Sequence, residues 1–170
     1  MTLVKVFDGK ETVPLTGEIP DSVLALLRMG TLCTDGTVRL VDGTEKHMGD
    51  PTETAIVAAA LRCGMPKEEL TSEHPRLGEI PFDSDRKLMT TVNLIHGKRV
   101  VIVKGAPDIL LGRCIAGNRE AAAAANEEMA RDALRVLALG YKIIDDTPMD
   151  CRPEELENGL TFGGLFGMID

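Results

Sequence analysis

Apolar residues along the chain fall largely into short runs and alternating patterns, which are typical of β-strands. Strands are predicted at residues 3–7, 37–41, 77–81, 88–95, 99–104, 141–144 and 160–169. The sequence His96-Gly97-Lys98 joins two of these strands as a hairpin, because glycine permits the tight turn that an antiparallel pair needs. We therefore expect the centre of the fold to be antiparallel.

Two early segments carry the signals of helix starts. Asp21 and Ser22 precede apolar residues at helical spacing, so this pair is expected to cap a first helix. The second start is marked by Asp50, Pro51 and Glu53. Aspartate is a good N-cap residue, proline fits the first helical position, and the glutamate stands where a capping box places its acid. This second helix is expected to run to about residue 62.

Two later segments are also predicted to be helical. A short helix is expected at residues 106–111, and a long one at residues 120–139, where an alanine-rich half is followed by apolar residues at helical spacing and by Gly140. Helices and strands are mixed without strict β-α-β alternation. The predicted fold is therefore α+β, a mainly antiparallel sheet flanked by helices. No repeat or linker divides the chain, so residues 1–170 are expected to form a single domain.

Composition narrows the class of function. The chain has 170 residues, with 27 Asp and Glu against 19 Lys and Arg, four Phe, one Tyr and no Trp. A net charge of −8 and few aromatic residues argue against nucleic-acid binding, which relies on basic surfaces and stacking platforms. No apolar run is long enough to span a bilayer, and the first residues do not resemble a signal peptide.

The cysteines and histidines are dispersed along the chain. No Cys-x-x-Cys pair occurs among the four cysteines, which are Cys33, Cys63, Cys114 and Cys151. This spacing indicates reduced thiols in a cytosolic compartment. The three histidines are equally scattered, so no metal site is predicted.

Common catalytic motifs are absent, and the candidate chemistry lies in one group of residues near the predicted strands: Phe82, Arg86, Lys87, Lys104 and Gly105. A phenyl ring can stack on a planar base, lysines can meet phosphate charge, and glycine lets a ligand approach the backbone. The residue types alone favour a plainer interpretation. In that interpretation Phe82 is a core residue, Arg86 and Lys87 occupy a solvated turn, and Lys104 ends a strand.

Five segments, in order, resemble the nucleotide-binding domain of the P-type cation-transporting ATPases of the type II, calcium-pump-like class. These segments are residues 49–55 (GDPTETA), 82–89 (FDSDRKLM), 103–108 (VKGAPD), 134–141 (LRVLALGY) and 160–170 (LTFGGLFGMID). Each segment alone would be a weak signal. Together they cover nearly the whole chain and make the resemblance specific.

The resemblance implies seven nucleotide-binding residues: Glu53, Phe82, Lys87, Lys104, Gly105, Ala106 and Arg135. Phe82 would stack on adenine, and Glu53 would help to form the adenine pocket. The two lysines would contact the nucleotide, and Arg135 would approach its phosphates from the long helix. The Gly-Ala pair would let the ring system lie against the backbone.

Three further observations bear on this set of nucleotide-binding residues. Arg135 also stands where it would pair with Asp132, one helical turn earlier. Ser84 stands where some family members carry an arginine, so that phosphate contact is not predicted here. The sequence around His74 (SEHP) resembles an ATP-binding element of heavy-metal pumps. The other motifs of those pumps are missing, so His74 is interpreted as a loop residue.

For the parent protein, the resemblance implies an ATP-driven cation pump in a membrane, with this domain on the cytoplasmic side. ATP would bind here, Mg²⁺ would be held through the parent protein, and the γ-phosphate would pass to an aspartate on a separate phosphorylation domain. The phosphorylation and actuator domains of the same chain would be its partners, and calcium is the favoured ion. We expect the chain to be an excised, monomeric domain without a catalytic residue of its own, which binds ATP but does not turn it over.

Two other classes of function remain open from the residues themselves. A stand-alone enzyme could use Lys87 or Lys104 to form a Schiff base, because desolvation makes a lysine more nucleophilic. An acidic interaction module would instead use the negative surface to hold a protein partner.

Overall fold

The computed structural model describes all 170 residues and contains a large sheet, a separate hairpin and six helices. The strands are β1 Thr2–Phe7, β2 Thr12–Pro14, β3 Thr37–Val41, β4 Thr44–Met48, β5 Arg76–Asp83, β6 Leu88–Ile95, β7 Lys98–Gly105, β8 Cys114–Ala116, β9 Arg135–Ile144 and β10 Leu160–Ile169. The helices are α1 Asp21–Leu32, α2 Pro51–Arg62, α3 Lys67–Glu73, α4 Pro107–Leu111, α5 Arg119–Arg131 and α6 Pro153–Leu156. None of the helices is both long and apolar enough to cross a bilayer.

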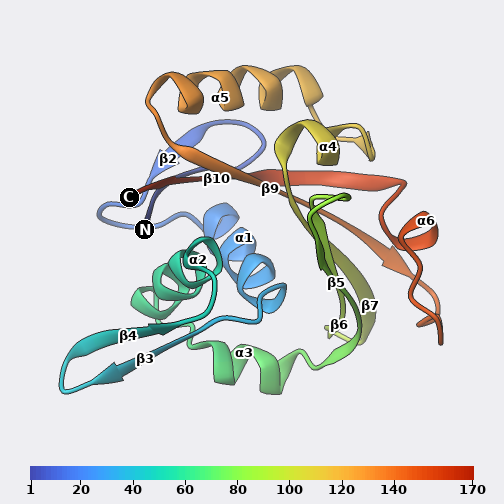
Figure 1. The fold of residues 1–170 in the computed structure, drawn as a ribbon, viewed down its shortest axis with the longest axis horizontal. Helices are drawn as coiled ribbons and strands as arrows, with labels where there is room; N and C mark the ends of the chain where they lie inside the picture. Colours follow the sequence, from blue (N-terminus) through green and yellow to red (C-terminus); the bar gives the residue numbers. More distant parts are fainter.

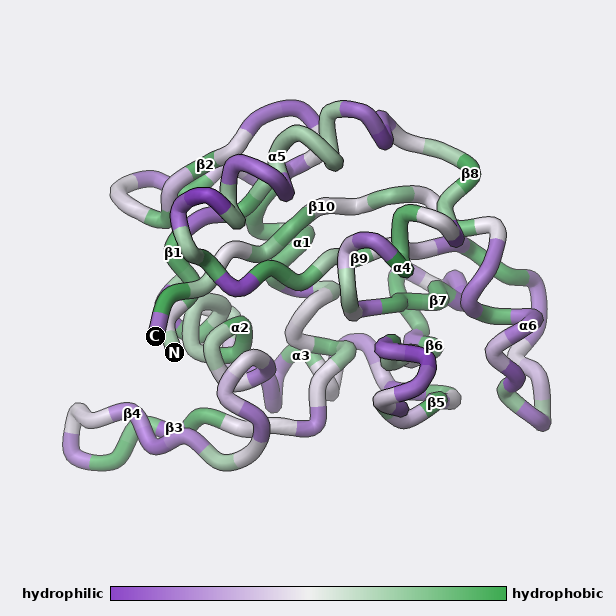
Figure 2. The backbone as a smooth tube through the Cα atoms, turned by 45° about the horizontal axis from the view of Figure 1, so that its top comes forward, coloured by the Kyte–Doolittle hydropathy of each residue, from purple (hydrophilic) through white to green (hydrophobic).

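The large sheet has the strand order β2-β1-β10-β9-β7-β6-β5, and every neighbouring pair in this order is antiparallel. Strand β8 adds a short parallel pairing to β10. Strands β3 and β4 form a separate hairpin that projects from the body of the molecule (Figures 1 and 2). The predicted α+β class with an antiparallel sheet is confirmed.

Helices cover both faces of the sheet. Successive side chains of a strand point to opposite faces, and in the central strands the side chains on both faces are apolar. Each face therefore needs a covering layer. In β7, Ile102 packs with the core under α1, α2 and α3, whereas Val101 and Val103 pack with the core under α4, α5 and α6. Figure 1 shows α5 on one side of the sheet and α1 and α2 on the other. The apolar segments of Figure 2 follow the same central strands.

The long helix predicted at residues 120–139 is wrong in its second half. Helix α5 ends at Arg131, and the chain turns back through Ala133, whose φ is 58°. The amide of Leu134 donates to the carbonyl of Met129, and that of Ala133 to the carbonyl of Ala130, which is the Schellman pattern that ends a helix. The residues after it pair with β10 and β7 as strand β9, so sheet pairing overrides their helix propensity.

The sequence also missed smaller elements and one cap. Helix α3 and strands β2, β4 and β8 were not predicted, and neither was the single turn α6. Helix α1 begins at Asp21 itself, its N-cap is Pro20, and no side chain caps it. Ser22 instead donates a hydrogen bond of 2.9 Å to Asp8. The helix is therefore confirmed, but its predicted capping by Asp21 and Ser22 is wrong.

Candidate functional site

One pocket brings together all seven residues that the sequence analysis singled out. Its volume is about 470 Å³, within the range usual for small-molecule sites. The antiparallel order explains the convergence, since the end of β5, the start of β6, the end of β7 and the start of β9 meet at one end of the sheet. The lining residues are Asp35, Asp50, Thr52, Glu53, Phe82, Lys87, Met89, Lys104, Gly105, Ala106, Pro107, Arg135, Val136 and Leu137.

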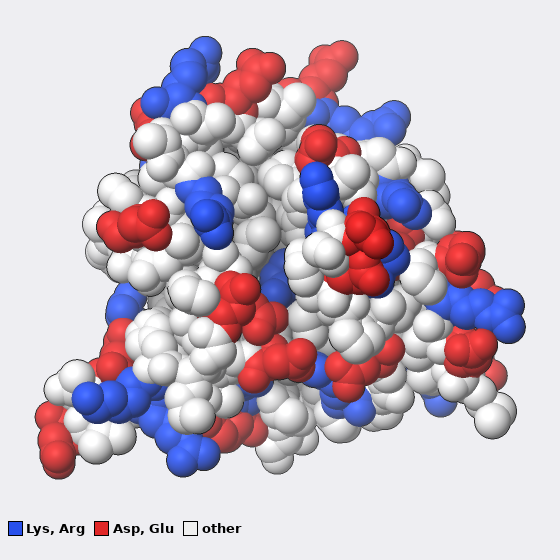
Figure 3. All heavy atoms as spheres, viewed as in Figure 1, with Lys and Arg blue, Asp and Glu red and all other residues white.

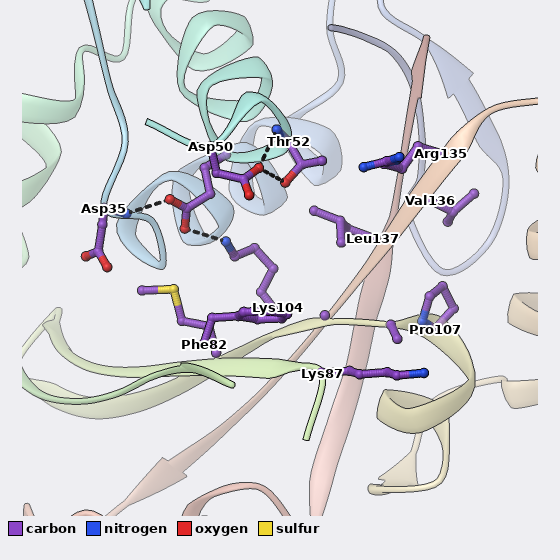
Figure 4. Close-up of a pocket in the computed structure, with 14 residues that line it drawn as sticks. Asp35, Asp50, Thr52, Phe82, Lys87, Lys104, Pro107, Arg135, Val136 and Leu137 are labelled. Atoms are coloured by element: carbon purple, nitrogen blue, oxygen red, sulfur yellow. Dashed lines mark hydrogen bonds and ion pairs between the residues drawn. The ribbon is translucent and has the colours of Figure 1, made fainter. Parts of the chain in front are cut away.

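The first turn of α2 supplies Glu53, which forms an ion pair with Lys104 on the floor of the pocket. The Lys104 ammonium lies 2.9 Å from Oε2 of Glu53, and only 5% of Lys104 is exposed (Figure 4). The other carboxylate oxygen, Oε1, accepts the backbone N–H groups of Asp35 at 3.1 Å and Gly36 at 3.2 Å. Both oxygens of Glu53 are therefore held by fixed donors.

This geometry corrects the predicted capping box. Asp50 is the N-cap of α2 as expected, since its carboxylate accepts the N–H of Thr52 at 2.8 Å. Glu53 does not reach back to Asp50, because it is drawn away from its own helix by Lys104 and by two backbone amides of a neighbouring loop. The N-cap is confirmed, and the reciprocal half of the box is wrong.

The loop that holds Glu53 is itself anchored by two cations. Lys67 donates to the carbonyls of Thr34 and Gly36, at 3.1 and 2.6 Å. Arg76 donates to the carbonyls of Leu32 and Thr34, at 2.9 and 2.7 Å. Burial lowers the pKa of the Lys67 ammonium. These contacts fix the backbone amides of residues 35 and 36 toward the carboxylate.

Phe82 stands near the end of β5 with 62% of its surface exposed, although it is one of only four phenylalanines in the chain. Its ring belongs to none of the core clusters, so the plainer interpretation of Phe82 as a core residue is wrong. Met89 and Leu137 add apolar surface to the same pocket. An exposed aromatic ring beside apolar walls suits a flat ligand.

Lys87 and Arg135 lie on one side of the pocket, away from Asp35 (Figure 4). Both residues are exposed, and neither forms an ion pair within the protein. Arg135 begins strand β9 and does not lie on a helix as predicted. Its expected pairing with Asp132 is also wrong, because Asp132 pairs with Lys5 at 3.2 Å. Two cations in the same pocket that have no ion-pair partner in the protein favour an anionic ligand group.

The packing of the fold itself requires a glycine at position 105. A Cβ atom at this position would clash with the carbonyl oxygen of Lys87 and would lie 3.0 Å from Cα of Leu88. The next residue, Ala106, donates its N–H to the same Lys87 carbonyl at 3.2 Å. Close packing against the start of β6 therefore requires the glycine, in addition to any need for a ligand to approach.

Several lining residues were not predicted as part of a site. Asp50 was predicted as a helix N-cap, and Val136 and Leu137 as part of a helix. These three residues and Thr52 also lie in segments that carry the family resemblance, but none was assigned a binding role. Asp35 was not predicted as a site residue. Two residues discussed in the sequence lie outside the lining. Ser84 is exposed, and His74 is buried with its ring 5.8 Å from that of His96.

The surface around the pocket carries no concentrated basic region. Lys and Arg side chains are interspersed with Asp and Glu over the face shown in Figure 3. The unpaired cations of the pocket therefore act locally, within an acidic chain.

The family model of the P-type ATPase cytoplasmic domain N matches residues 22–170. The chain is 38% identical over its whole length to calcium-transporting ATPase 1 of Lactococcus lactis, and 33% identical over its whole length to a calcium-transporting ATPase of Listeria monocytogenes. A cation-transporting ATPase of Synechocystis is 35% identical over 89% of the chain. The chain spans about a fifth of the length of these relatives, 20%, 21% and 18% respectively. The chain therefore belongs to the cytoplasmic N domains of the P-type ATPases, the ATP-binding domains of these cation pumps.

Proposed function

We propose that ATP binds in the pocket with its adenine stacked on Phe82 and its phosphates directed toward Lys87 and Arg135. The observation that carries the proposal is the exposed Phe82 ring in a pocket that also presents two unpaired cations. Aromatic stacking of a base contributes about 1–3 kcal/mol. The apolar side chains of Met89 and Leu137 would exclude water from the ring.

The charges around the pocket indicate how the bound nucleotide would be oriented. Glu53 and Lys104 offer an acceptor and a donor deep in the pocket, next to the wall that Phe82 forms. An adenine ring can use both kinds of partner, whereas a triphosphate would be repelled by the acidic end at Asp35 and Asp50. Gly105 and Ala106 would let the ring system lie against the backbone. The triphosphate would then extend toward Lys87 and Arg135.

In the parent protein, this domain would position the γ-phosphate of ATP for transfer to an aspartate on a separate phosphorylation domain. Positioning of this kind can supply a large part of a rate enhancement. The 170 residues include no group of three or more His, Cys, Asp or Glu side chains suited to a metal ion. As the resemblance implies, Mg²⁺ would be held with ATP through the parent protein.

The same family membership supports a proposal about the whole protein from which the domain comes. The names of the relatives make calcium the favoured transported ion, in a membrane pump whose cytoplasmic side carries this domain. The phosphorylation and actuator domains of that pump would be the partners of residues 1–170, which would form one monomeric, nucleotide-binding unit. The Schiff-base enzyme and the acidic interaction module have no support from these comparisons.

Isothermal titration of the 170-residue chain tests the proposal. The wild-type chain should bind ATP with one-to-one stoichiometry. Replacing Lys87 and Arg135 together by alanine should weaken ATP binding but leave adenosine binding nearly unchanged. The matched control replaces Arg39 and Lys46, two cations of the β3–β4 hairpin, and so alters the net charge equally. The proposal is wrong if the wild-type chain does not bind ATP, or if the pocket and hairpin variants lose affinity equally.

A phosphate-release assay tests the expected division of labour. In the pumps that the chain resembles, the phosphorylated aspartate lies in an Asp-Lys-Thr-Gly-Thr segment. Residues 1–170 contain no such segment, so they should not turn over bound ATP. Sustained phosphate release that disappears with Phe82→Ala would show that the chain supplies a nucleophile or base of its own.

A further inference from the structure

Glu157 is a fully buried carboxylate that lies outside the pocket. It caps the C-terminus of α6, just before β10, and 0% of its surface is exposed. Its Oε1 accepts Nε of Arg86 at 2.9 Å, and its Oε2 accepts a second guanidinium nitrogen of Arg86 at 3.0 Å. The hydroxyl of Thr90 donates to Oε2 at 2.6 Å. All these bonds run to the β5–β6 hairpin.

Arg86 joins the two legs of that hairpin. Besides Glu157, its guanidinium donates to the carbonyl of Pro81 at 3.2 Å and to the carbonyl of Leu88 at 2.9 Å. Pro81 immediately precedes Phe82, and Leu88 immediately follows Lys87. The Arg86 guanidinium therefore bridges the two ends of the loop, next to the pocket residues Phe82 and Lys87.

The loop between these positions has an unfavourable backbone conformation at Lys87. The φ angle of Lys87 is 63°, in the left-handed region that residues other than Gly, Asn and Asp seldom adopt. The amide of Lys87 donates to the carbonyl of Asp83 at 2.6 Å, and its carbonyl accepts the amide of Ala106. Such a conformation persists only when its surroundings hold it.

We propose that Glu157 is a positioning residue for nucleotide binding: by fixing the Arg86 guanidinium, it holds Phe82 and Lys87 in the orientation that ATP requires. This inference rests on the proposed ATP site. A buried ion pair is a weak source of stability, because apolar residues of similar volume often serve as well. The rigid, forked geometry of the guanidinium is what an apolar pair could not reproduce.

The first test replaces Glu157 by glutamine, which keeps the shape of the side chain and removes its charge. Titration with ATP should show affinity lowered roughly 10-fold or more, the size of effect that orienting partners of metal ligands commonly have. In the absence of ATP, the NMR signals of the Lys87 amide and the Phe82 ring should shift. The matched control is Glu154→Gln, the same change on the exposed face of α6, which should alter neither readout.

A double variant separates positioning from stability. Arg86→Leu combined with Glu157→Leu leaves no buried charge unpaired, so its thermal midpoint should approach that of the wild type. Its ATP affinity should stay low, because the bonds to the Pro81 and Leu88 carbonyls are lost. This variant also decides the matter if the single variant does not fold.

The outcomes distinguish the two proposals. If the wild-type chain binds ATP and a folded Glu157→Gln variant binds it equally well, the positioning role is wrong. The role is also wrong if the double variant regains affinity together with stability. Failure of the wild-type chain to bind ATP would overturn the proposed function, and the positioning role with it.

Discussion

At the scale of single residues, the most informative side chain is Phe82, because its exposure has no explanation in the packing of the protein. A phenyl ring that is 62% exposed leaves apolar surface in contact with water, and the two main cores close without it. In the proposed function, a flat ligand would cover the ring. The sequence alone pointed to the core, and only the resemblance to a family pointed to a base.

Replacing Phe82 by alanine should therefore separate binding from stability. The loss of a stacking platform should weaken ATP binding by about 1–3 kcal/mol, roughly 5- to 150-fold. The free energy of unfolding should change little, because the ring buries little surface in the fold. Isothermal titration and urea denaturation measure the two effects.

Two further variants serve as controls for that prediction. Phe82→Tyr keeps an aromatic face and should retain most of the affinity. Ile143→Ala removes another exposed apolar side chain, outside the pocket, and should have no effect on ATP. Equal ATP affinity in Phe82→Ala and wild type would contradict the assigned role.

The residues implied by the resemblance come together in the structure, but the local explanations offered for two of them fail. All seven implied residues line one pocket, yet the local reasons given for Glu53 and Arg135 were wrong. The capping box failed because the true partners of Glu53, Lys104 and the loop at residues 35 and 36, are distant in sequence. Spacing along the chain carries no information about such partners.

At the scale of elements, helix α2 shows a start that the sequence could predict. Asp50 caps the helix, and hydrogen bonds from the Thr52 hydroxyl and backbone lower the pKa of its carboxyl below the ordinary value of 3.8. A carboxyl whose pKa is lower in the folded state stabilises that state above its ordinary pKa. This contribution is lost as the pH falls through the lowered value.

Asp50→Ala should accordingly cost about 1 kcal/mol of unfolding free energy at neutral pH. The difference between wild type and variant should disappear as the pH falls well below 3.8, because both then lack the charged cap. Urea denaturation at a series of pH values measures this difference in the free energy of unfolding. A difference that stays constant down to the acid limit would show that the carboxylate charge is not what stabilises the helix.

The boundary between α5 and β9 shows a helix end that the sequence concealed. Ala133 occupies the left-handed C′ position of the Schellman turn, where glycine is the usual residue. Alanine gives no signal of a stop, and the run of alanines before it favours continuing the helix. The predicted stop at Gly140 therefore falls within a strand that pairs with both β10 and β7.

Ala133→Gly should raise the free energy of unfolding by up to about 1 kcal/mol, because glycine adopts a positive φ without a steric cost. The control is Ala124→Gly on the exposed side of α5, which should lower it by about 1 kcal/mol. Opposite signs from the same substitution, measured by urea denaturation, would establish the turn. Destabilisation by both would mean that α5 continues past residue 131.

At the scale of the whole molecule, the fold class followed from the mixture of elements, but the layout of the sheet did not. The predicted hairpin of β6 and β7 is local, and its register needs only a two-residue turn. The adjacency of β9 to β7 joins residues about forty positions apart and depends on packing between the two helical layers. That adjacency brings Arg135 to the pocket, so the site depends on a contact that no local pattern encodes.

The net charge of the whole chain also bears on how ATP would bind. A net charge of −8 opposes the approach of ATP, so in the proposed site binding would depend on the few cations that no carboxylate in the protein neutralises. Lys87 and Arg135 are such groups, whereas Lys104 is already paired with Glu53. The domain thus combines a general repulsion with a local attraction.

Binding of ATP at this end of the sheet can be measured by titrating the ¹⁵N-labelled chain with ATP and following its backbone amide signals. We expect saturable shifts that are largest around Glu53, Phe82, Lys87 and the Lys104–Gly105 segment, with the β3–β4 hairpin unaffected. Adenosine should reproduce the shifts near Phe82 and lack those near Lys87. Unshifted signals at these residues, or shifts concentrated away from this end of the sheet, would contradict the proposed ATP site.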